Sequence, residues 1–480
     1  HAHIDHSGLI PLMYVNGFRG QVYSTSATAQ LCEIMLRDSA HIQMFEAEWR
    51  NRKAARSGGK LKEFVPLYDM DAAVNVCKQF VGCEYDRVYD IAEGIKIRFT
   101  DVGHLLGSAS IEVWATEKTE NGDVTEKIVF SGDIGNINKP IIKDPKHVRD
   151  ADYVVMESTY GNRSHGGTPN YVEDLTDIFK RTFERGGNVV IPSFAVGRTQ
   201  ELLYIIRKIK EDNLVGRDFD VYMDSPLAIE ATNIFIKNVE SCFDDDAVEL
   251  VRKGINPLSF PGLKYATTGD ESKQINFDPN PKVIISSSGM CEAGRIRHHL
   301  KHNLWRPECT IVFVGYQAVG TTGRIIVDGA EEIKLFGEPI QIKAEIVQLK
   351  GSSGHADKDG LLCWINAFDT KPKKVFVVHG EDSVCDEFTE CLKEEYGYDA
   401  MAPYTGGSYD LIADRVISEG VKERKTRRTT STQRGKTVFD RLVAAGKRLM
   451  TVITHNEGGT NKDLAKFTDQ INALCDKWDR

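Results

Sequence analysis

The amino-acid sequence predicts an α/β protein. Between Tyr171 and Val314, short apolar strands alternate with helical segments, and this order is typical of a parallel sheet covered by helices on both faces. The chain has 480 residues, enough for two or three domains at roughly 100–200 residues each. Its hydrophobic fraction of 41% and its charged fraction of 27% are ordinary for a globular protein with a sizeable core.

The charge balance and the cysteines limit the functional classes. The 61 Lys and Arg against 70 Asp and Glu give a net charge of −9, which excludes a generally basic, histone-like nucleic-acid binder but leaves room for a local basic cleft. No apolar run approaches the ~18 residues that cross a bilayer, so we expect no membrane partner. The ten cysteines occur singly, with no C-x-x-C pair, which favours reduced thiols in a cytoplasmic protein.

The first part of the chain begins with a long helix and continues with strands. The helix is expected over Thr28–Arg56, and four strand segments follow it: Val88–Thr100, Ile111–Ala115, Lys127–Phe130 and Val154–Met156. The last strand leads directly into Glu157. The next segment, Tyr160–Asn170, is rich in Gly, Ser, Asn and Pro and predicts a domain boundary.

A regular alternation of helices and strands follows this boundary. Helices are expected at Tyr171–Arg185, Thr199–Glu211, Ala228–Lys237 and Glu292–Leu304, and strands at Asn188–Pro192, Phe219–Met223, Val283–Ser286 and Thr310–Val314. Ile325–Leu349 alternates as strands do, and its Gly337-Glu338-Pro339 turn indicates a hairpin. The pattern is completed by a helix at Lys358–Phe368, a strand at Lys374–Val378 and a helix at Asp382–Tyr396.

The C-terminal part differs in composition. Lys422–Lys436 is rich in Thr, Ser, Arg and Lys, which is typical of a solvated linker. A final helix is expected, with a narrow apolar seam formed by Leu464, Phe467, Ile471, Leu474 and Trp478. The seam either docks on the chain's own core, which we favour, or binds a partner or a second copy.

Ligand-type side chains are dense at the beginning of the chain. In His1-Ala2-His3-Ile4-Asp5-His6, the i, i+2 spacing puts His1 and His3 on one side of an extended segment. Asp5 and His6 follow where the chain turns and are free to face a second ion. Because imidazole and carboxylate groups bind Zn²⁺ at about 2.0–2.2 Å, four such residues in six predict a metal site.

Three further candidate ligands follow predicted strands. His104 comes after the strand that ends at Thr100, Asp133 lies on a Gly turn after Phe130, and His379 follows Val378 directly. Side chains placed where strands end at one edge of a sheet can converge on a common site. Together with the N-terminal cluster, these residues predict a single metal centre.

This ordered set of motifs resembles the metallo-β-lactamase fold, an αββα sandwich with a two-metal centre. Glu157-Ser158-Thr159-Tyr160-Gly161, Gly354-His355-Ala356-Asp357 and His379-Gly380-Glu381 resemble the three additional motifs of the β-CASP nucleases, which carry an inserted α/β domain. The resemblance covers residues 1–412 and points to bacterial and archaeal relatives of the nuclease subunit of the cleavage and polyadenylation specificity factor.

The resemblance implies a division of the chain. Residues 1–165 would form the first part of the metallo-β-lactamase domain, 166–345 the inserted β-CASP domain, 346–412 the return segment, and 413–480 a basic linker with C-terminal helices. The family's first strands, with an Asp that orients the site, have no counterpart here. We therefore expect the natural chain to extend upstream.

The resemblance also implies the ligands and the reaction. The two Zn²⁺ ions, with Mn²⁺ as an alternative, would be held by His1, His3 and His104 on one side and by Asp5, His6 and His379 on the other, with Asp133 bridging both. Two such ions share a bridging water that becomes hydroxide near neutral pH and attacks the phosphorus, which leaves a 5′-phosphate and a 3′-hydroxyl. His355 is the candidate for stabilising or protonating the leaving oxygen, and Glu157 is expected to orient it.

Substrate contacts are expected in the inserted domain. Ser193 and Arg198 lie where a strand leads into a helix, whose first N–H groups can receive a phosphate. Ser288 and Gly289 have the same position after a strand, and Arg295 belongs to the basic helix that follows.

These features predict a zinc-dependent ribonuclease that acts on single-stranded RNA in RNA processing or decay. We expect endonucleolytic cleavage, with 5′–3′ exonucleolytic cleavage as an additional activity. RNA is preferred because the RNA-processing branches of the family carry His at the position of His379, whereas DNA-repair relatives usually lack it. A DNA-processing nuclease of the same superfamily and a non-catalytic RNA-binding scaffold are the alternatives, and related enzymes make a homodimer plausible.

Overall fold

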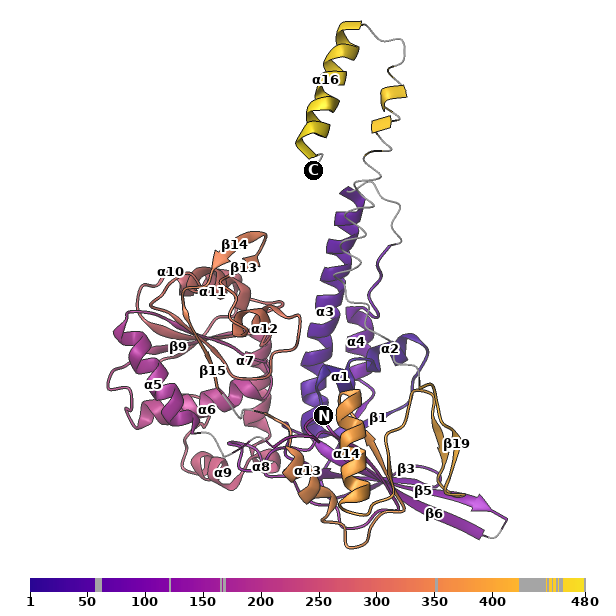
Figure 1. The fold of residues 1–480 in the computed structure, drawn as a ribbon. Coiled ribbons are helices and arrows are strands. Elements are labelled where there is room, and N and C mark those ends of the chain that lie inside the picture. Colours follow the sequence, from indigo (N-terminus) through magenta and orange to yellow (C-terminus); the bar gives the residue numbers. More distant parts are fainter. Residues whose placement is uncertain are drawn as a thin grey trace. The chain divides into compact units, whose positions relative to one another are not determined.

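A computed structural model of the chain (Figure 1) describes residues 1–56, 63–120, 122–164, 166, 170–349, 353–422 and 461–478, with residues 446, 449, 450, 452–454 and 456. The chain divides into two compact units. The first comprises His1–Pro403 and Gly407–Glu419, and the second comprises Tyr404–Gly406 and Gly420–Arg480. The first unit contains all the catalytic, metal and substrate residues predicted from the sequence.

A seven-stranded mixed sheet forms the centre of the first part of this unit. Its strands, in spatial order, are β17 (Ala400–Met401), β16 (Lys374–Val378), β7 (Tyr153–Glu157), β6 (Gly122–Phe130), β5 (Ala109–Thr119), β4 (Ile95–Asp101) and β3 (Val88–Ala92). Pairing is parallel from β17 to β6 and antiparallel from β6 to β3. Because two antiparallel steps separate β4 from β6, β4 runs in the same direction as β6, β7 and β16.

Helices and a second sheet cover the two faces of this sheet. On one face α13 (Lys358–Ile365) and α14 (Asp382–Glu394) bury Trp364 and Phe388 against Val154 and Val375. The second sheet pairs β1 (Val22–Thr25) with β2 (Phe80–Cys83) in parallel, and its Cys83 joins a small core with Ile97 and Phe99 of β4. The outer helices are α1 (Ile4–Ser7), α2 (Ile10–Val15), α3 (Ser26–Arg56) and α4 (Met70–Cys77). The resulting order is helix, sheet, sheet, helix.

The inserted part is built on a six-stranded parallel sheet. In spatial order its strands are β10 (Leu263–Tyr265), β9 (Asp220–Asp224), β11 (Lys282–Ser286), β8 (Val189–Pro192), β12 (Thr310–Phe313) and β15 (Glu345–Gln348). Alternate residues point to opposite faces, so Val189 and Ile191 enter one core while Val190 enters another. One face is covered by α5 (Tyr171–Glu184), α6 (Arg198–Glu211) and α7 (Pro226–Lys237), and the other by α10 (Gly269–Phe277), α11 (Ile296–Asn303) and α12 (Thr322–Val327) (Figure 1). The predicted parallel sheet with two covered faces is confirmed.

The smaller elements complete the unit. They are α8 (Val239–Cys242), α9 (Asp245–Arg252), the hairpin of β13 (Glu332–Leu335) and β14 (Glu338–Gln341), and the hairpin of β18 (Ser408–Asp410) and β19 (Arg415–Ser418). The β13–β14 hairpin lies within the predicted segment, but its turn residues are Phe336 and Gly337, which both have positive φ.

Three sequence predictions need correction. The single strand predicted at Val88–Thr100 is a hairpin of β3 and β4, because Gly94 reverses the chain with φ +75°. The helix predicted from Glu292 begins only at Ile296, since Cys291 and Gly294 have φ values of +63° and +81°, outside the α-helical range. A short helix, α12, also ends inside the segment predicted as strands from Ile325 onwards.

The second unit contains α16 (Asn461–Trp478), on which the predicted apolar seam lies. Leu474 is exposed there, and Leu464, Phe467 and Ile471 are half-buried. The predicted linker lies outside the described residues from position 423 onwards. Among the described helices, none combines the length and the apolar character that a membrane span requires.

A first prediction concerns Gly161, which lies in the turn after β7. A Cβ atom at this position would lie 2.7 Å from Cγ of the buried Phe388. Gly161→Ala should therefore lower the free energy of unfolding by about 1–3 kcal/mol, as overpacking of cores does, in urea denaturation. The control is Gly269→Ala, where a Cβ meets nothing within 4 Å. Equal stability of Gly161→Ala and the wild type would contradict the close packing of this turn on α14.

Candidate metal centre

Four strands carry candidate functional residues to one edge of the seven-stranded sheet. His104 follows β4, Asp133 follows β6, His379 follows β16, and Glu157 is the last residue of β7. Since these strands run in one direction, their carboxyl ends lie at the same edge. Gly103 and Gly132, with φ values of +66° and +60°, make the sharp turns directly before the first two ligands.

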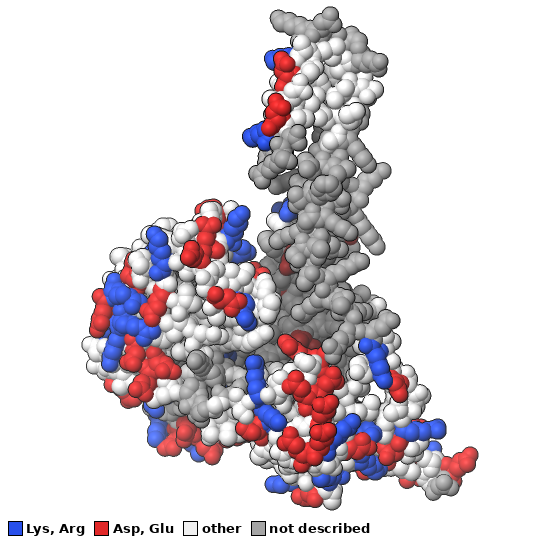
Figure 2. Space-filling view, viewed as in Figure 1, with Lys and Arg blue, Asp and Glu red and all other residues white. Residues whose placement is uncertain are grey.

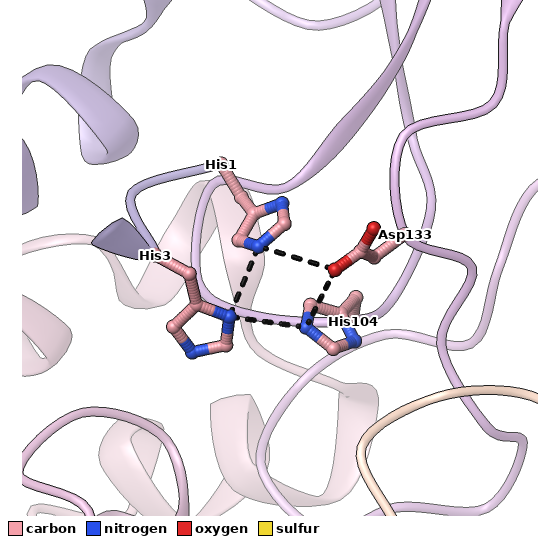
Figure 3. Close-up of side chains that lie close together, drawn as sticks. All are labelled: His1, His3, His104 and Asp133. Carbon is pink, nitrogen blue, oxygen red and sulfur yellow. Dashed lines mark hydrogen bonds and ion pairs between the residues drawn. The ribbon is translucent and has the colours of Figure 1, made fainter. Parts of the chain in front are cut away.

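Three histidine rings and one carboxylate oxygen form a first group (Figure 3). His3 Nδ1 lies 3.0 Å from His1 Nε2 and 3.3 Å from His104 Nε2. Asp133 Oδ2 lies 3.4 Å from His1 Nε2 and 3.7 Å from His104 Nε2. His104 Nδ1 donates to the carbonyl of Gly354 at 3.2 Å, which leaves Nε2 with its lone pair facing the group.

A second group uses the other oxygen of the same carboxylate. His6 Nε2 lies 3.2 Å from Asp133 Oδ1 and 3.2 Å from His379 Nε2. Asp5 Oδ2 lies 3.6 Å from His379 Nε2 and 3.9 Å from His6 Nε2. His379 Nδ1 contacts Thr159 Oγ1 at 3.1 Å, and the Thr159 hydroxyl donates to the His379 carbonyl, which orients the ring. The structure thus brings together all seven residues predicted as ligands.

The groups have the dimensions of cation sites. Four ligands about 2.0–2.1 Å from a tetrahedral ion would lie about 3.3 Å from one another, which is close to the spacing of the first group. Asp133 is 2% exposed, and its Oδ1 accepts no hydrogen bond from any described residue, although His6 Nε2 is near. A buried carboxylate oxygen without a donor is costly, and a cation would satisfy it. The residues present therefore fit metal ions.

The protonation states of His3 and His104 also suit metal binding. Burial lowers the pKa of His3 to about 4 and lowers that of His104 well below its usual value, so both rings are neutral and can act as ligands. By contrast, the neighbouring carboxylate of Asp5 raises the pKa of His379 to about 9. A cation between Asp5 and His379 would replace the proton that the pair otherwise shares.

His355 stands beside the centre and is held by Glu157. Its Nδ1 lies 3.2 and 3.1 Å from the two carboxylate oxygens of Glu157, and its Nε2 lies 3.9 Å from Asp133 Oδ2. Burial opposes the charged ring, but the hydrogen bond and the charge of Glu157, with the charge of Asp133, raise the pKa of His355 above its usual value. Glu157 is itself 1% exposed and accepts from the Ile134 N–H. The predicted pairing of Glu157 with His355 is present in the structure.

A cavity of about 270 Å³ opens beside this centre, between the first part of the chain and the inserted part. Its wall includes His3, His104 and His355. Ser193, Arg198 and Gly289, which were predicted as substrate contacts, line it from the inserted part.

Two predicted substrate contacts lie elsewhere. Ser288 and Arg295 are not among the described residues that line this cavity. Arg295 Nη1 binds Asp224 Oδ1 at 2.7 Å and the Ala266 carbonyl at 2.9 Å, while Nη2 binds the Thr267 carbonyl. Its guanidinium group thus links β9 to the segment before α10 within the inserted domain. A role in substrate binding stays a prediction.

Sequence reasoning missed Lys139 and Glu201. Lys139, in the loop after Asp133, lines the cavity, and its Nζ lies 3.1 Å from Oε1 of Glu201 on α6. Glu201 also pairs with Arg198. The only signal in the sequence was a lysine six positions after a candidate ligand. This signal does not distinguish Lys139 from an ordinary surface lysine.

Two family models match separate segments of this chain, and relatives match most of its length. A Beta-Casp domain model matches residues 199–326, and a model described as Zn-dependent metallo-hydrolase RNA specificity domain matches residues 339–403. A ribonuclease of Thermus thermophilus is 33% identical over 382 residues, which are 80% of this chain and 80% of that protein. An RNase J-like protein of Methanocaldococcus jannaschii is 31% identical over 385 residues, 79% of this chain and 80% of that protein.

A longer relative is transcription termination factor FttA of Methanosarcina mazei. It is 32% identical over 412 residues, which cover 84% of this chain but 61% of the factor. The two model matches are compatible with an inserted domain followed by a return segment, while the predicted domain boundaries themselves stay predictions.

A second prediction tests the cluster as a metal site. Zn²⁺ or Mn²⁺ should raise the thermal midpoint of the wild-type chain, because a ligand that binds only the folded state at 100 times its Kd stabilises it by about 2.7 kcal/mol. Asp133→Asn removes the carboxylate shared by both groups and should abolish most of the shift, while Asp90→Asn on the exposed strand β3 should keep it. Equal shifts in all three proteins would show that the ions bind elsewhere.

Proposed function

We propose that this chain, which belongs to the β-CASP family of metallo-β-lactamase-fold nucleases, is a zinc-dependent ribonuclease that hydrolyses phosphodiester bonds of single-stranded RNA. Membership confirms the predicted fold, an αββα sandwich with an inserted α/β domain, and makes the chain a metal-dependent hydrolase. The observation that carries the proposal is the arrangement of six ligand side chains around the carboxylate of Asp133, beside a cavity shared by two domains.

Two ions are proposed because Asp133 presents a separate oxygen to each group of ligands. One would be held by His1, His3, His104 and Asp133, and the other by Asp5, His6, His379 and Asp133. When bound, such a pair supplies an activated water near neutral pH and offsets the negative charge that develops on the phosphate oxygens. Asp133 fixes the positions of the two ligand groups relative to each other, because a shift of its carboxylate would disturb both groups.

His355 is proposed to donate a proton to the leaving oxygen. Its Nε2 faces the centre, and Glu157 holds Nδ1 so that the ring keeps its orientation and its proton. In the reaction, the oxygen of a hydroxide ion bonds to phosphorus, the bond from phosphorus to the 3′ oxygen breaks, and that oxygen takes the proton from His355. The products are a 5′-phosphate and a 3′-hydroxyl.

RNA is the proposed substrate, although this chemistry does not require a 2′-hydroxyl. Support comes from the match to an RNA specificity domain and from relatives named as ribonucleases. Endonucleolytic cleavage with an additional 5′–3′ exonucleolytic activity is part of the proposal. The scaffold alternative is disfavoured, because a protein that only binds RNA has no need of seven converging ligands. A homodimer and a cytoplasmic location also belong to the proposal.

A third prediction tests the reaction and the substrate. With Zn²⁺ or Mn²⁺, 5′-labelled single-stranded RNA should be cut into products with 5′-phosphates, and DNA of the same sequence should be largely spared. Asp133→Asn should be inactive, because it removes the residue common to both ligand groups. Cleavage of DNA in place of RNA would favour the DNA-processing alternative, and cleavage of neither, with metal bound, would refute the nuclease proposal for these substrates.

A fourth prediction separates His355 and Glu157 from the metal ligands. His355→Ala should lower kcat by about 10²–10⁴-fold, as the loss of a general acid does, with metal content unchanged by elemental analysis. Glu157→Gln should cost about 10–100-fold, the usual effect of losing a partner that orients a functional group. His298→Ala, on the surface of α11, is the control. An unchanged rate for His355→Ala would refute its assigned role.

A further inference from the structure

Lys139 is a largely buried cation beside the metal centre that the mechanism above does not use. Its side chain is 11% exposed, and it lines the cavity together with His104, His355 and Arg198. Its Nζ donates to the carbonyl oxygen of His104 at 3.0 Å and pairs with Glu201 Oε1 at 3.1 Å. It is thus fixed in position from both the first domain and the inserted domain.

The ammonium group has a donor to spare. An ammonium group carries three N–H donors, and among the described residues the polar partners of Lys139 are the His104 carbonyl and Glu201. The third donor belongs to a side chain in the wall of the cavity, where a ligand can accept it. Glu201 stays ionised, because Arg198 and Lys139 lower its pKa against the effect of burial, and it holds the ammonium in place.

The acidic surface of the protein makes cations inside the cavity important for binding RNA phosphates. The outer face of α14 carries Asp382, Asp386, Glu387, Glu390 and Glu394, and acidic side chains gather over this region in Figure 2. With a net charge of −9, the chain as a whole repels a polyanion. The positive charge that attracts RNA phosphates must therefore come from cations in the cavity. Lys139 is one of these cations, and it lies next to a metal ligand.

We infer that Lys139 binds a phosphate of the RNA strand adjacent to the phosphate that is cleaved. Its ammonium contacts the backbone carbonyl of His104, whereas the ring of His104 faces Asp133, so the group lies beside the ligand cluster and not within it. The contact is one charge-assisted hydrogen bond to a non-bridging oxygen. This inference rests on the proposed ribonuclease function and adds a phosphate-binding residue to it.

The test compares normal RNA with RNAs in which single linkages around the cleavage site are replaced by uncharged methylphosphonates. With normal RNA, Lys139→Met should have a KM about 10–100-fold higher than that of the wild type, because a hydrogen bond to a charged group is lost. Its kcat should change much less. In the wild type, a methylphosphonate at one linkage next to the cleaved one should raise KM to the same extent. Lys139→Met should be indifferent to that one replacement and sensitive to the others.

Two variants guard against a merely structural effect. Lys139→Arg keeps the charge and should retain most of the affinity for normal RNA. Lys143→Met is the matched control, because Lys143 lies in the same loop and donates to the Ser241 carbonyl of the inserted domain at 2.9 Å but does not line this cavity. Its KM should match that of the wild type.

The outcomes separate the two proposals. If the wild type cleaves RNA and Lys139→Met has an unchanged KM, or stays sensitive to every methylphosphonate, Lys139 does not bind a phosphate while the ribonuclease function stands. If the wild type, with metal bound, cleaves no RNA at all, the proposed function fails and this inference fails with it.

Discussion

The site depends on one buried carboxylate that faces two sets of ring nitrogens. Asp133 Oδ2 lies against His1 and His104, and Oδ1 lies against His6. This is achieved because β6 ends in a turn at the centre of a sheet in which β4, β7 and β16 run in the same direction. A reversal of any one of these strands would carry its functional residue to the opposite edge. The topology of the sheet is therefore the condition for the chemistry, and the helices on its faces serve to hold that topology.

The same carboxylate explains why the site is incomplete as protein alone. A carboxylate that is 2% exposed carries a desolvation cost of several kcal/mol unless positive charge compensates it. The rings of His3 and His104 do not supply that charge, since burial keeps them neutral. Against the effect of burial, His6, His355 and His379 lower the pKa of Asp133, so part of the compensation comes from these rings. Cations between the ligand atoms satisfy the carboxylate and the ring lone pairs together. Ion binding and the stability of this region are therefore coupled, as expected where ligands must be deprotonated to bind.

The sequence predicted those features that are local or that lie at strand ends. The ligands could be found because each follows an apolar strand or belongs to the dense segment His1–His6. The pairing of Lys139 with Glu201 could not, because 62 positions separate them and both residues are ordinary surface types in the sequence. Arg295 shows the converse limit. Its place at the start of a basic helix indicated nucleic-acid binding, which stays a prediction, but no pattern in the sequence singled out the buried Asp224 that binds its guanidinium group. Side-chain partners across domains are decided by packing that periodicity does not encode.

The inserted domain supplies part of the cavity wall that is proposed to contact the substrate strand. Hydrolysis at two metal ions does not distinguish RNA from DNA, so the choice of substrate must be made by groups that touch the strand away from the cleaved bond. Arg198 and Glu201 come from the inserted domain, Lys139 and His355 from the first, and they line one cavity. Because Glu201 pairs with cations from both domains, the same contact that joins the domains also fixes the cations of the groove. A change in how the domains meet would therefore alter substrate binding before it altered the metal centre, whose ligands all come from the first domain.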